Sequence, residues 1–245
     1  MYGDLDRPPL RADALNHALA PDGFRVEVLE ETSSTNAVVA ERARAGEPHG
    51  LVVVAEQQTA GRGRLDRSWV SPRRAGLTFS VLVRPSGPVH WVPLLGGVGV
   101  ATALREHVGV EAELKWPNDV LVGGKKVAGL LAEAVDGAVV LGIGINVTTK
   151  ADELPVPEAT SLALEGATTT DRDTVLRSVL RGISDALGDD ARSSYRELCS
   201  TLGRQVRVDL PGGESVSGTA EAVDDEGRLV VDGRAYAAGD VVHLR

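Results

Sequence analysis

A glycine- and arginine-rich stretch at residues 61–74, GRGRLDRSWVSPRR, is the part of the sequence best suited to binding a charged ligand. It holds five arginines and one aspartate, although the whole chain carries a formal net charge of −9. Arginine binds phosphate oxygens in pairs, Gly61 and Gly63 let the backbone wrap around an anion, and Trp69 offers a flat face to a purine. The stretch therefore indicates a nucleotide site, although a flexible basic loop or an RNA contact would use the same residues.

A second segment, KWPNDVLVGGKKVAGLLAE at residues 115–133, concentrates the lysines of the chain. Only four of the 26 basic residues are lysines, and three of them lie here: Lys115, Lys125 and Lys126. Because the chain otherwise uses arginine, their retention indicates that at least one position needs a compact ammonium group. Lys125 is equally well explained as part of a solvated turn.

The same segment places polar side chains where two predicted strands begin. Asn118 and Asp119 follow Pro117 and supply an amide and a carboxylate, which suit a nucleotide or a magnesium ion. A turn that uses proline, asparagine and aspartate only for their backbone preferences is the alternative. Lys126 would follow a Gly-Gly turn and reach back over the site, and Gly129 within a strand favours close approach of a ligand.

Two shorter motifs are less specific by themselves. SSTN at residues 33–36 precedes a predicted helix, where hydroxyl and amide side chains are often caps. GIGIN at residues 142–146 alternates glycine with isoleucine in a predicted strand and ends on Asn146. That alternation indicates only that something approaches the backbone closely.

Several classes of chemistry are disfavoured. The five histidines are scattered without metal-ligand spacing, and the single cysteine, Cys199, lies far in sequence from every motif, so nucleophilic catalysis is not expected. No Walker A or dinucleotide-binding glycine pattern occurs. An acidic chain is poorly suited to binding nucleic acid, whose backbone attracts positively charged surfaces. No apolar run approaches the roughly 18 residues of a membrane span, and no signal pattern opens the chain. We expect a cytoplasmic protein.

The elements that must position these residues follow from periodicity and turn signals. Two hairpin signals, Gly-Gly at 123–124 and Asp-Gly at 136–137, separate β-rich runs and favour an antiparallel sheet. Helical patterns flank these runs. The predicted strands cover 24–32, 51–58 and 76–85, and the predicted helices cover 11–20, 37–46, 92–109 and 171–189 with the following stretch to 202. The fold class is α+β, with a mixed or antiparallel sheet flanked by helices.

After Gly203 the pattern changes to short strands separated by turn residues, which is typical of a small β-barrel of about 45 residues. We therefore divide the chain into a short N-terminal extension at 1–24, a catalytic domain at 25–200 and a C-terminal β-barrel at 201–245.

Taken together, the motifs resemble the catalytic domain of biotin protein ligases. The matching pieces are SSTN (33–36), EQQTAGRGRLDRSW (56–69), KWPNDVLV (115–122), KKVAGLLAE (125–133) and GIGINV (142–147). The resemblance covers residues 25–245 and implies a class II synthetase-like catalytic domain with an SH3-like barrel. Only about 24 residues precede the first catalytic strand, so we expect no helix-turn-helix repressor module and no DNA binding.

The resemblance also implies roles for individual residues. Those expected around biotin are Ser34, Thr35, Asn36, Gln58, Arg62, Gly63, Arg64, Lys126 and Gly129. Those expected around ATP are Arg62, Arg64, Arg67, Trp69, Asn118, Asp119 and Asn146. The catalytic set is Lys126, Arg62 and Arg64, and Mg²⁺ is expected near Asn118 and Asp119.

The implied activity is ATP-dependent formation of biotinyl-5′-AMP, followed by transfer of biotin to a lysine of a biotin carboxyl carrier domain of an acetyl-CoA, acyl-CoA or pyruvate carboxylase. Two anions must meet in the first step, so cations are expected to supply much of the catalysis. We expect a monomer or a weak homodimer that contacts no membrane. The alternatives are a lipoate ligase-like acyl transferase, or a non-catalytic regulator that responds to biotin.

Overall fold

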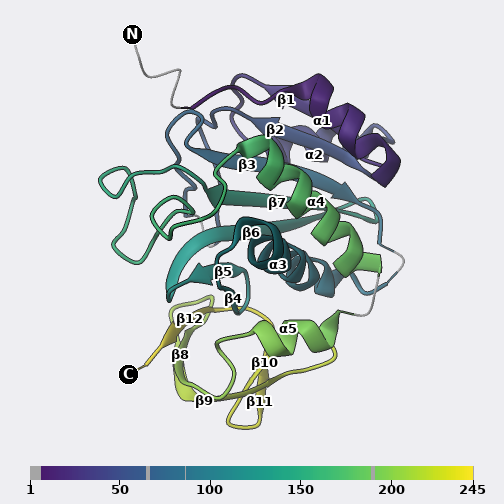
Figure 1. Ribbon diagram of the computed structural model, residues 1–245. Helices are drawn as coiled ribbons and strands as arrows, with labels where there is room; N and C mark the ends of the chain where they lie inside the picture. Colours follow the sequence, from purple (N-terminus) through teal and green to yellow (C-terminus); the bar gives the residue numbers. More distant parts are fainter. Residues whose placement is uncertain (1–6, 65–66, 86, 189–190, 245) are drawn as a thin grey trace.

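A seven-stranded mixed sheet forms the centre of the larger part of the molecule (Figure 1). The computed structural model describes residues 7–64, 67–85, 87–188 and 191–244. Its strand order is β1-β2-β3-β7-β6-β5-β4; β1 and β2 are parallel and all other neighbours are antiparallel. The strands are β1 (Arg25–Leu29), β2 (Leu51–Ala55), β3 (Gly76–Val83), β4 (Ala112–Lys115), β5 (Asp119–Val122), β6 (Lys125–Val135) and β7 (Ala138–Asn146).

Helices cover both faces of this sheet, as predicted for the fold class. Alternate residues of β2 separate the two faces: Leu51 and Val53 pack with α2, whereas Val52 and Val54 belong to the larger core on the opposite side. That larger core includes α3 and α4, which stand in front of the sheet in Figure 1. The helices are α1 (Ala12–Leu19), α2 (Thr35–Arg44), α3 (Val92–Ala103), α4 (Arg172–Gly188) and α5 (Arg192–Leu198).

The glycines of α3 have a packing role. A Cβ atom at Gly99 would lie 2.5 Å from the carbonyl oxygen of Gly182 on α4, so only glycine allows the two helices to come this close. The helix predicted over 92–109 is found at 92–103, with one π-helical turn at 104–108 after it. Part of the predicted 171–189 helix, residue 189, lies outside the described residues, as do 1–6 of the N-terminal extension.

Both predicted hairpin turns join strands that position the motifs. Gly123 and Gly124 have φ values of 58° and 76°, and Asp136 and Gly137 have 46° and 76°. Two consecutive residues with positive φ are typical of the two-residue turns that match strand twist. These turns set the register of β5, β6 and β7, and therefore fix which of their side chains share a face.

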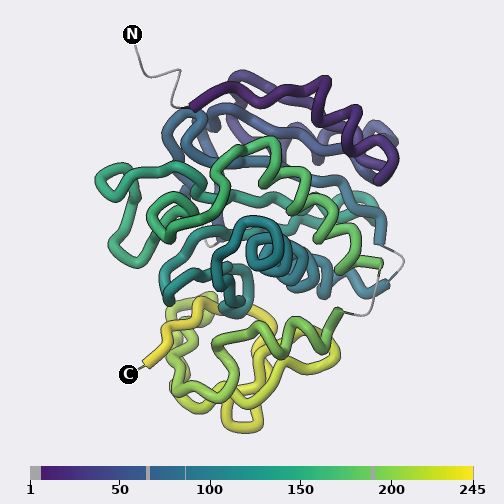
Figure 2. The backbone as a smooth tube through the Cα atoms, viewed as in Figure 1, coloured from purple at the N-terminus to yellow at the C-terminus, as the bar shows by residue number. Residues whose placement is uncertain are grey.

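A five-stranded antiparallel sheet with the order β11-β10-β9-β8-β12 forms the C-terminal part. Its strands are β8 (Gln205–Asp209), β9 (Ser215–Val223), β10 (Leu229–Val231), β11 (Arg234–Tyr236) and β12 (Asp240–His243). This all-β module lies against the β4–β5 edge of the large sheet (Figure 2). The indoles of Trp91 and Trp116 donate hydrogen bonds to the carbonyls of Asp225 and Gly227, at 2.7 and 3.0 Å, and so join the two parts.

Among the described residues, no helix is both long and apolar enough to cross a membrane.

Candidate active site

One cavity collects nearly all the residues that the motifs singled out. It lies where the start of α2, the segment 57–75 and strands β3, β5, β6, β7 and β12 meet, and its volume is about 130 Å³. Of the predicted residues it is lined by Ser34, Thr35, Asn36, Gln58, Arg62, Gly63, Arg64, Arg67, Trp69, Asn118, Asp119, Lys126 and Gly129. Asn146 is the exception. Residues 65 and 66 of the arginine-rich stretch lie outside the described part of the chain.

One end of the cavity is a network of hydroxyl and amide groups. The backbone N–H and the hydroxyl of Thr35 both donate to Gln58 Oε1, at 2.7 and 3.1 Å. Ser80, which is fully buried on β3, lies 2.7 Å from the Thr35 hydroxyl and 2.6 Å from Asn36 Oδ1. Ser34 occupies the N-cap position of α2, but its side chain makes no capping hydrogen bond. The SSTN motif thus serves the cavity more than it caps the helix.

Glycines of β6 and β7 form a floor: Gly129 and Gly142 line the cavity, and Gly144 lies beneath the indole of Trp69. Gly129 on β6 lies directly opposite Gly144 on β7, and the indole of Trp69 rests on both. A Cβ atom at Gly144 would lie 2.2 Å from Trp69 Cε2, and one at Gly129 would lie 3.3 Å from the same ring. A Cβ atom at Gly142 would meet Asn36 Oδ1 at 2.1 Å. The close backbone approach predicted for the GIGIN glycines is therefore confirmed. At Gly129 the approaching groups are the Trp69 ring and Lys126, and the ligand contact predicted there stays a prediction.

The other end of the cavity, around Arg64, Arg67 and Lys126, is cationic, whereas Arg62 lies nearer the first end, where Glu133 also accepts from Asn36 Nδ2 at 3.1 Å. Each arginine of the 61–67 segment that lines the cavity reaches a partner on a different element. These contacts are an ion pair of Arg62 with Glu133 on β6 (3.0 Å), a hydrogen bond from Arg64 Nη1 to Asn118 Oδ1 (3.2 Å) and an ion pair of Arg67 with Asp240 on β12. Both ion pairs are solvent-exposed, since the Arg62 and Arg67 side chains are 52% and 70% accessible. Exposed pairs of this kind contribute about 0–1 kcal/mol each, so a ligand can replace them easily.

Lys126 completes the cationic end. Its ammonium lies 2.6 Å from Asp119 Oδ1 and 5.7 Å from the centre of the Trp69 ring. The register between β5 and β6 shifts at Val120 and Leu121, immediately before Lys126 pairs with Leu121. Such an irregularity re-aims the side chains that follow it. Lys126 thus faces the cavity.

Sequence reasoning missed three charged residues. Lys115 is packed beside Asp119 and Lys126, and burial lowers the pKa of its ammonium group, with Lys126 and Arg67 acting in the same direction. Burial likewise lowers the pKa of Arg64, while Asp240 and Asp119 oppose that shift. Lys115 could have been found, because it begins the KWPND motif. Glu133 could likewise have been found, because it ends the KKVAGLLAE motif, whereas Asp240 carried no comparable signal.

Asn146 does not line the cavity. It is buried at the end of β7, and its amide donates to the carbonyl of Thr160 at 2.9 Å. It therefore holds the segment that returns past Lys126, whose carbonyl accepts from the Thr160 N–H at 2.8 Å. The nucleotide contact expected of Asn146 stays a prediction.

The carboxylates of the cavity suit a magnesium ion that arrives with a nucleotide. The described residues contain no cluster of three or more histidine, cysteine, aspartate or glutamate side chains that could hold a metal by themselves. Magnesium in nucleotide sites, however, is held by one or two carboxylates together with phosphate oxygens. Asp119, which lines the cavity beside Asn118, fits that requirement.

The chain matches two protein-family profiles in the order that the fold predicts. Residues 28–149 match the biotin/lipoate A/B protein ligase family, and residues 201–244 match the biotin protein ligase C-terminal domain. The chain is also 42% identical to the biotin–[acetyl-CoA-carboxylase] ligase of Mycobacterium tuberculosis, over 99% of this chain and 98% of that one. It belongs to the biotin protein ligase family.

Further relatives agree with this assignment. A biotin–[acetyl-CoA-carboxylase] ligase of Paracoccus denitrificans is 32% identical over 85% of this chain and 94% of its own. The crystal structure of the Aquifex aeolicus biotin protein ligase in complex with biotin and ATP is 31% identical. It superposes with a TM-score of 0.76 over 90% of this chain and 98% of that one. The predicted fold class, a mixed sheet flanked by helices with a small C-terminal β-module, is confirmed.

Proposed function

We propose that this enzyme activates biotin with ATP as biotinyl-5′-AMP and then transfers the biotinyl group to a lysine of a biotin carboxyl carrier domain of an acetyl-CoA carboxylase. One observation carries the proposal. The cavity joins a neutral hydrogen-bonding end to a cationic end across a flat glycine floor. Biotin has the same layout, with a ureido head, an apolar middle and a carboxylate.

At the neutral end, we assign the ureido group to Ser34, Thr35, Asn36 and Gln58. The carbonyl of Gln58 and the hydroxyls offer both acceptors and donors, which a ureido oxygen and its two N–H groups require. A buried site that hydrogen-bonds its ligand discriminates strongly against molecules without those groups, because its own polar atoms would be left unpaired. This end therefore favours biotin over lipoate, whose dithiolane ring has no N–H groups.

The biotin carboxylate and the ATP phosphates are both anions, and we assign the task of bringing them together to Lys126, Arg62 and Arg64. A carboxylate oxygen of biotin attacks the α-phosphorus of ATP. The bond between the α-phosphorus and the oxygen that links it to the β-phosphorus breaks, and pyrophosphate leaves. Positive charge fixed around the phosphorus stabilises the charge that develops there. Asp119 would hold a magnesium ion, which neutralises phosphate charge when bound. Asn118 and Arg67, which line the same cavity, would contact the remaining phosphates, and Gly63 would let the backbone approach them.

Trp69 must move for both ligands to enter. The cavity of about 130 Å³ is smaller than the roughly 300–1,000 Å³ of typical ligand pockets, and the Trp69 indole lies on the glycine pair. We propose that the ring leaves Gly129 to the apolar part of biotin and stacks on the adenine. The segment 61–74 would then close over the adenylate and exclude water until the acceptor amine attacks the acyl carbon and AMP departs.

Biotin-dependent exchange of labelled pyrophosphate into ATP tests the proposal, because only reversible adenylate formation gives that signal. We expect exchange with biotin and at most weak exchange with lipoate. Equal exchange with both acids would identify a broader acyl ligase, and exchange with neither would contradict the proposal. Labelling of a purified carrier domain, but not of its Lys→Arg variant, tests the second step.

The remaining expectations stay predictions. They are the division into 1–24, 25–200 and 201–245, transfer to a pyruvate carboxylase, a monomer or weak homodimer, the lack of DNA binding and a cytoplasmic location. For the division, the structure adds that β8 begins at Gln205, whereas the buried side chains of the C-terminal module belong to the same core cluster as the large sheet. We therefore propose two modules that are packed as one body.

A further inference from the structure

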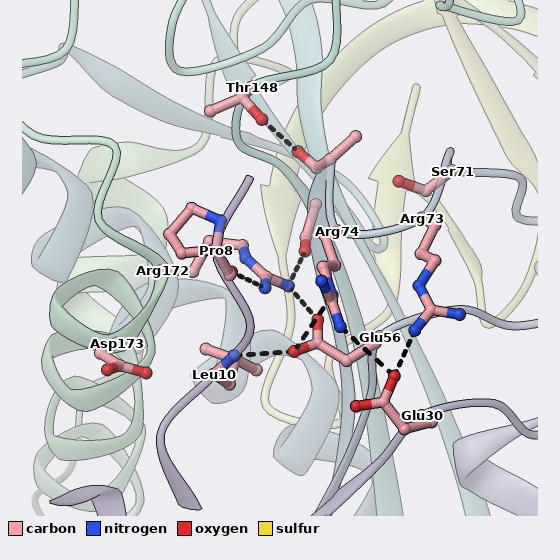
Figure 3. A network of polar contacts seen from close by, with 12 residues as sticks. Pro8, Leu10, Glu30, Glu56, Ser71, Arg73, Arg74, Thr148, Arg172 and Asp173 are labelled. Carbon is pink, nitrogen blue, oxygen red and sulfur yellow. Dashed lines mark hydrogen bonds and ion pairs between the residues drawn. The ribbon is translucent and has the colours of Figure 1, made fainter. Parts of the chain in front are cut away.

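A buried charge network lies beneath the segment that carries the ligand-binding arginines (Figure 3). Its centre is Glu56, the residue after β2, whose side chain has no exposed surface. The Glu56 carboxylate accepts from Arg172 Nη1 on α4 at 2.6 Å and from the backbone N–H of Leu10 at 2.7 Å. The Arg172 side chain is 6% accessible. None of these three residues lines the cavity.

The network holds both ends of the 57–75 segment. At the start, Glu56 donates its own N–H to the carbonyl of Leu29 at 2.9 Å, continuing the pairing of β1 with β2. At the end, the N–H of Arg74 donates to the Glu56 carbonyl at 2.9 Å. The Arg172 guanidinium also donates to the carbonyl of Gly76, the first residue of β3, at 3.3 Å. Glu56 and Arg172 together therefore hold the residues at the start and at the end of the 57–75 segment.

The same guanidinium ties in the N-terminal segment. Arg172 Nη2 donates to the carbonyl of Pro8 at 2.6 Å, and the Leu10 N–H completes the carboxylate's contacts. In Figure 3 Arg172 lies between Pro8 and Glu56. Residues before α1 thus cover the charge pair and keep it out of water.

Burial makes this anchor different from an ordinary surface pair. Exposed ion pairs can exchange partners at little cost, whereas removing one member of a buried pair leaves an uncompensated charge in the interior. Breaking this pair therefore costs more free energy than breaking the exposed pairs at the cavity. A stable pair at the base of the segment favours motion of the part beyond it.

We infer that Glu56 and Arg172 are positioning residues for the reaction: by clamping both ends of the 57–75 segment they place Gln58, Arg62, Arg64 and Trp69 over the cavity. The inference rests on the proposed function. It deepens that proposal by assigning a task to residues that touch neither substrate. Displacement of reacting groups by about 1 Å is enough to slow catalysis by about 10²-fold.

The decisive variant removes both charges. Glu56→Gln and Arg172→Met are each expected to lower the melting temperature, because each leaves one buried charge unpaired. The double variant E56Q/R172M removes both charges of the buried pair, and Arg74, whose side chain lies 4.0 Å from Glu56, keeps its ion pair with Glu30 at 3.4 Å. Replacement of a whole buried pair is often neutral for stability. We expect it to recover most of the melting temperature. Its segment keeps the backbone hydrogen bonds of residue 56 but loses the Arg172 contacts that fix the Glu56 side chain and Gly76.

Asp173 provides a matched control. It is the neighbour of Arg172 on α4, is also buried, and binds the same N-terminal segment through the backbone N–H of Arg11 at 3.2 Å. It makes no contact with Glu56, Arg74 or Gly76 among the described hydrogen bonds. Asp173→Asn should therefore lower stability without releasing the 57–75 segment.

Three measurements separate positioning from mere stability: melting temperature, the rate of trypsin cleavage after the arginines of 62–74, and kcat and KM in pyrophosphate exchange. For E56Q/R172M at a temperature where it is folded, we expect cleavage faster by about tenfold or more. We also expect kcat/KM for ATP to fall by about 10²-fold. D173N should match the parent protein in both. Cleavage is measured without ligand, so it tests the anchor even if another acid proves to be the substrate.

Parent-like cleavage and kinetics in folded E56Q/R172M would overturn the inference and leave the pair with a structural role only. Equal losses in E56Q/R172M and D173N, compared at the same fraction folded, would overturn it as well. A greater loss in E56Q/R172M than in D173N supports it, whether or not the melting temperature recovers.

Discussion

The two charge clusters attached to the 57–75 segment use the same residue types under opposite conditions. At the cavity, Arg62, Arg67 and Lys126 pair with carboxylates in contact with solvent. At the base of the segment, Arg172 pairs with a Glu56 that has no exposed surface. The first set can release its partners when phosphates arrive, and the second cannot. Burial, more than residue type, separates a cation that serves chemistry from one that serves architecture.

The largest effect is expected from substitution of Lys126 in the solvent-exposed cluster. If the solvent-exposed cluster performs the chemistry, Lys126→Ala should slow adenylate formation by about 10²–10³-fold, as expected for removal of one preorganised charge at a reacting centre. Lys126→Arg should restore little, because the guanidinium is wider than the ammonium. Single-turnover formation of the adenylate measures both. An unchanged rate in Lys126→Ala would remove this residue from the mechanism.

A smaller effect on ligand binding is expected from a substitution in the glycine floor. In Gly144→Ala, the new methyl group would lie 2.2 Å from the present position of Trp69 Cε2, so the ring must shift. Loss of this aromatic packing costs the unliganded protein about 0.5–1.5 kcal/mol. Since the ring is proposed to leave the floor when the ligands bind, affinity for ATP should rise by about 2–10-fold. Calorimetric titration with ATP in the presence of biotin measures it. Gly188→Ala is the control, because nothing lies within 4 Å of its added Cβ atom. Equal affinities would show that the ring does not rest on this floor.

The Arg67–Asp240 pair tests whether a ligand can replace solvent-exposed ion pairs at little cost. Asp240→Asn should change KM for ATP by less than about fivefold, since such pairs contribute about 0–1 kcal/mol. The difference should shrink further at high salt, which screens exposed charges. Asp225→Asn is a control in the same C-terminal module, because Asp225 pairs with Arg196 and does not line the cavity. A loss of 10²-fold in Asp240→Asn would instead make Asp240 a part of the catalytic machinery.

The smallest effect is expected where the two sheets meet. Burial, reinforced by Lys115 and Arg204, lowers the pKa of His243 to about 4 from 6.5. The Thr201 hydroxyl accepts from the backbone N–H of Trp116 and lies 3.1 Å from His243 Nε2. With a pKa of about 4, the imidazole is neutral at pH 7. The unfolded chain binds this proton more readily between pH 6.5 and 4, so stability should fall as the pH is lowered through that window. His243→Gln should reduce the fall in melting temperature between pH 7 and 5. An identical pH profile would show that His243 does not contribute.

Most of the cavity could be predicted from local sequence. Glycine pairs and Asp-Gly specify the turns that align β5, β6 and β7, and period-two alternation then places Gly129, Gly142 and Gly144 on determined faces. The family and the enzyme class, read from five short motifs, are confirmed by the relatives. The SSTN motif shows the limit of such reading, since a cap and a ligand contact use the same residue types.

The amino-acid sequence alone determined the fold class and the hairpins, because dihedral preferences and periodicity act over a few residues. The resemblance of its motifs to biotin protein ligases supplied the family and many of the residues that line the cavity. Only the tertiary structure decided the contacts that join distant elements. Asp240 reaches the site from another sheet, and Glu56 meets Arg172 across 116 positions of sequence. Whether an arginine side chain is solvent-exposed or buried depends on the residues that pack over it, and the packing of the whole chain decides which residues those are.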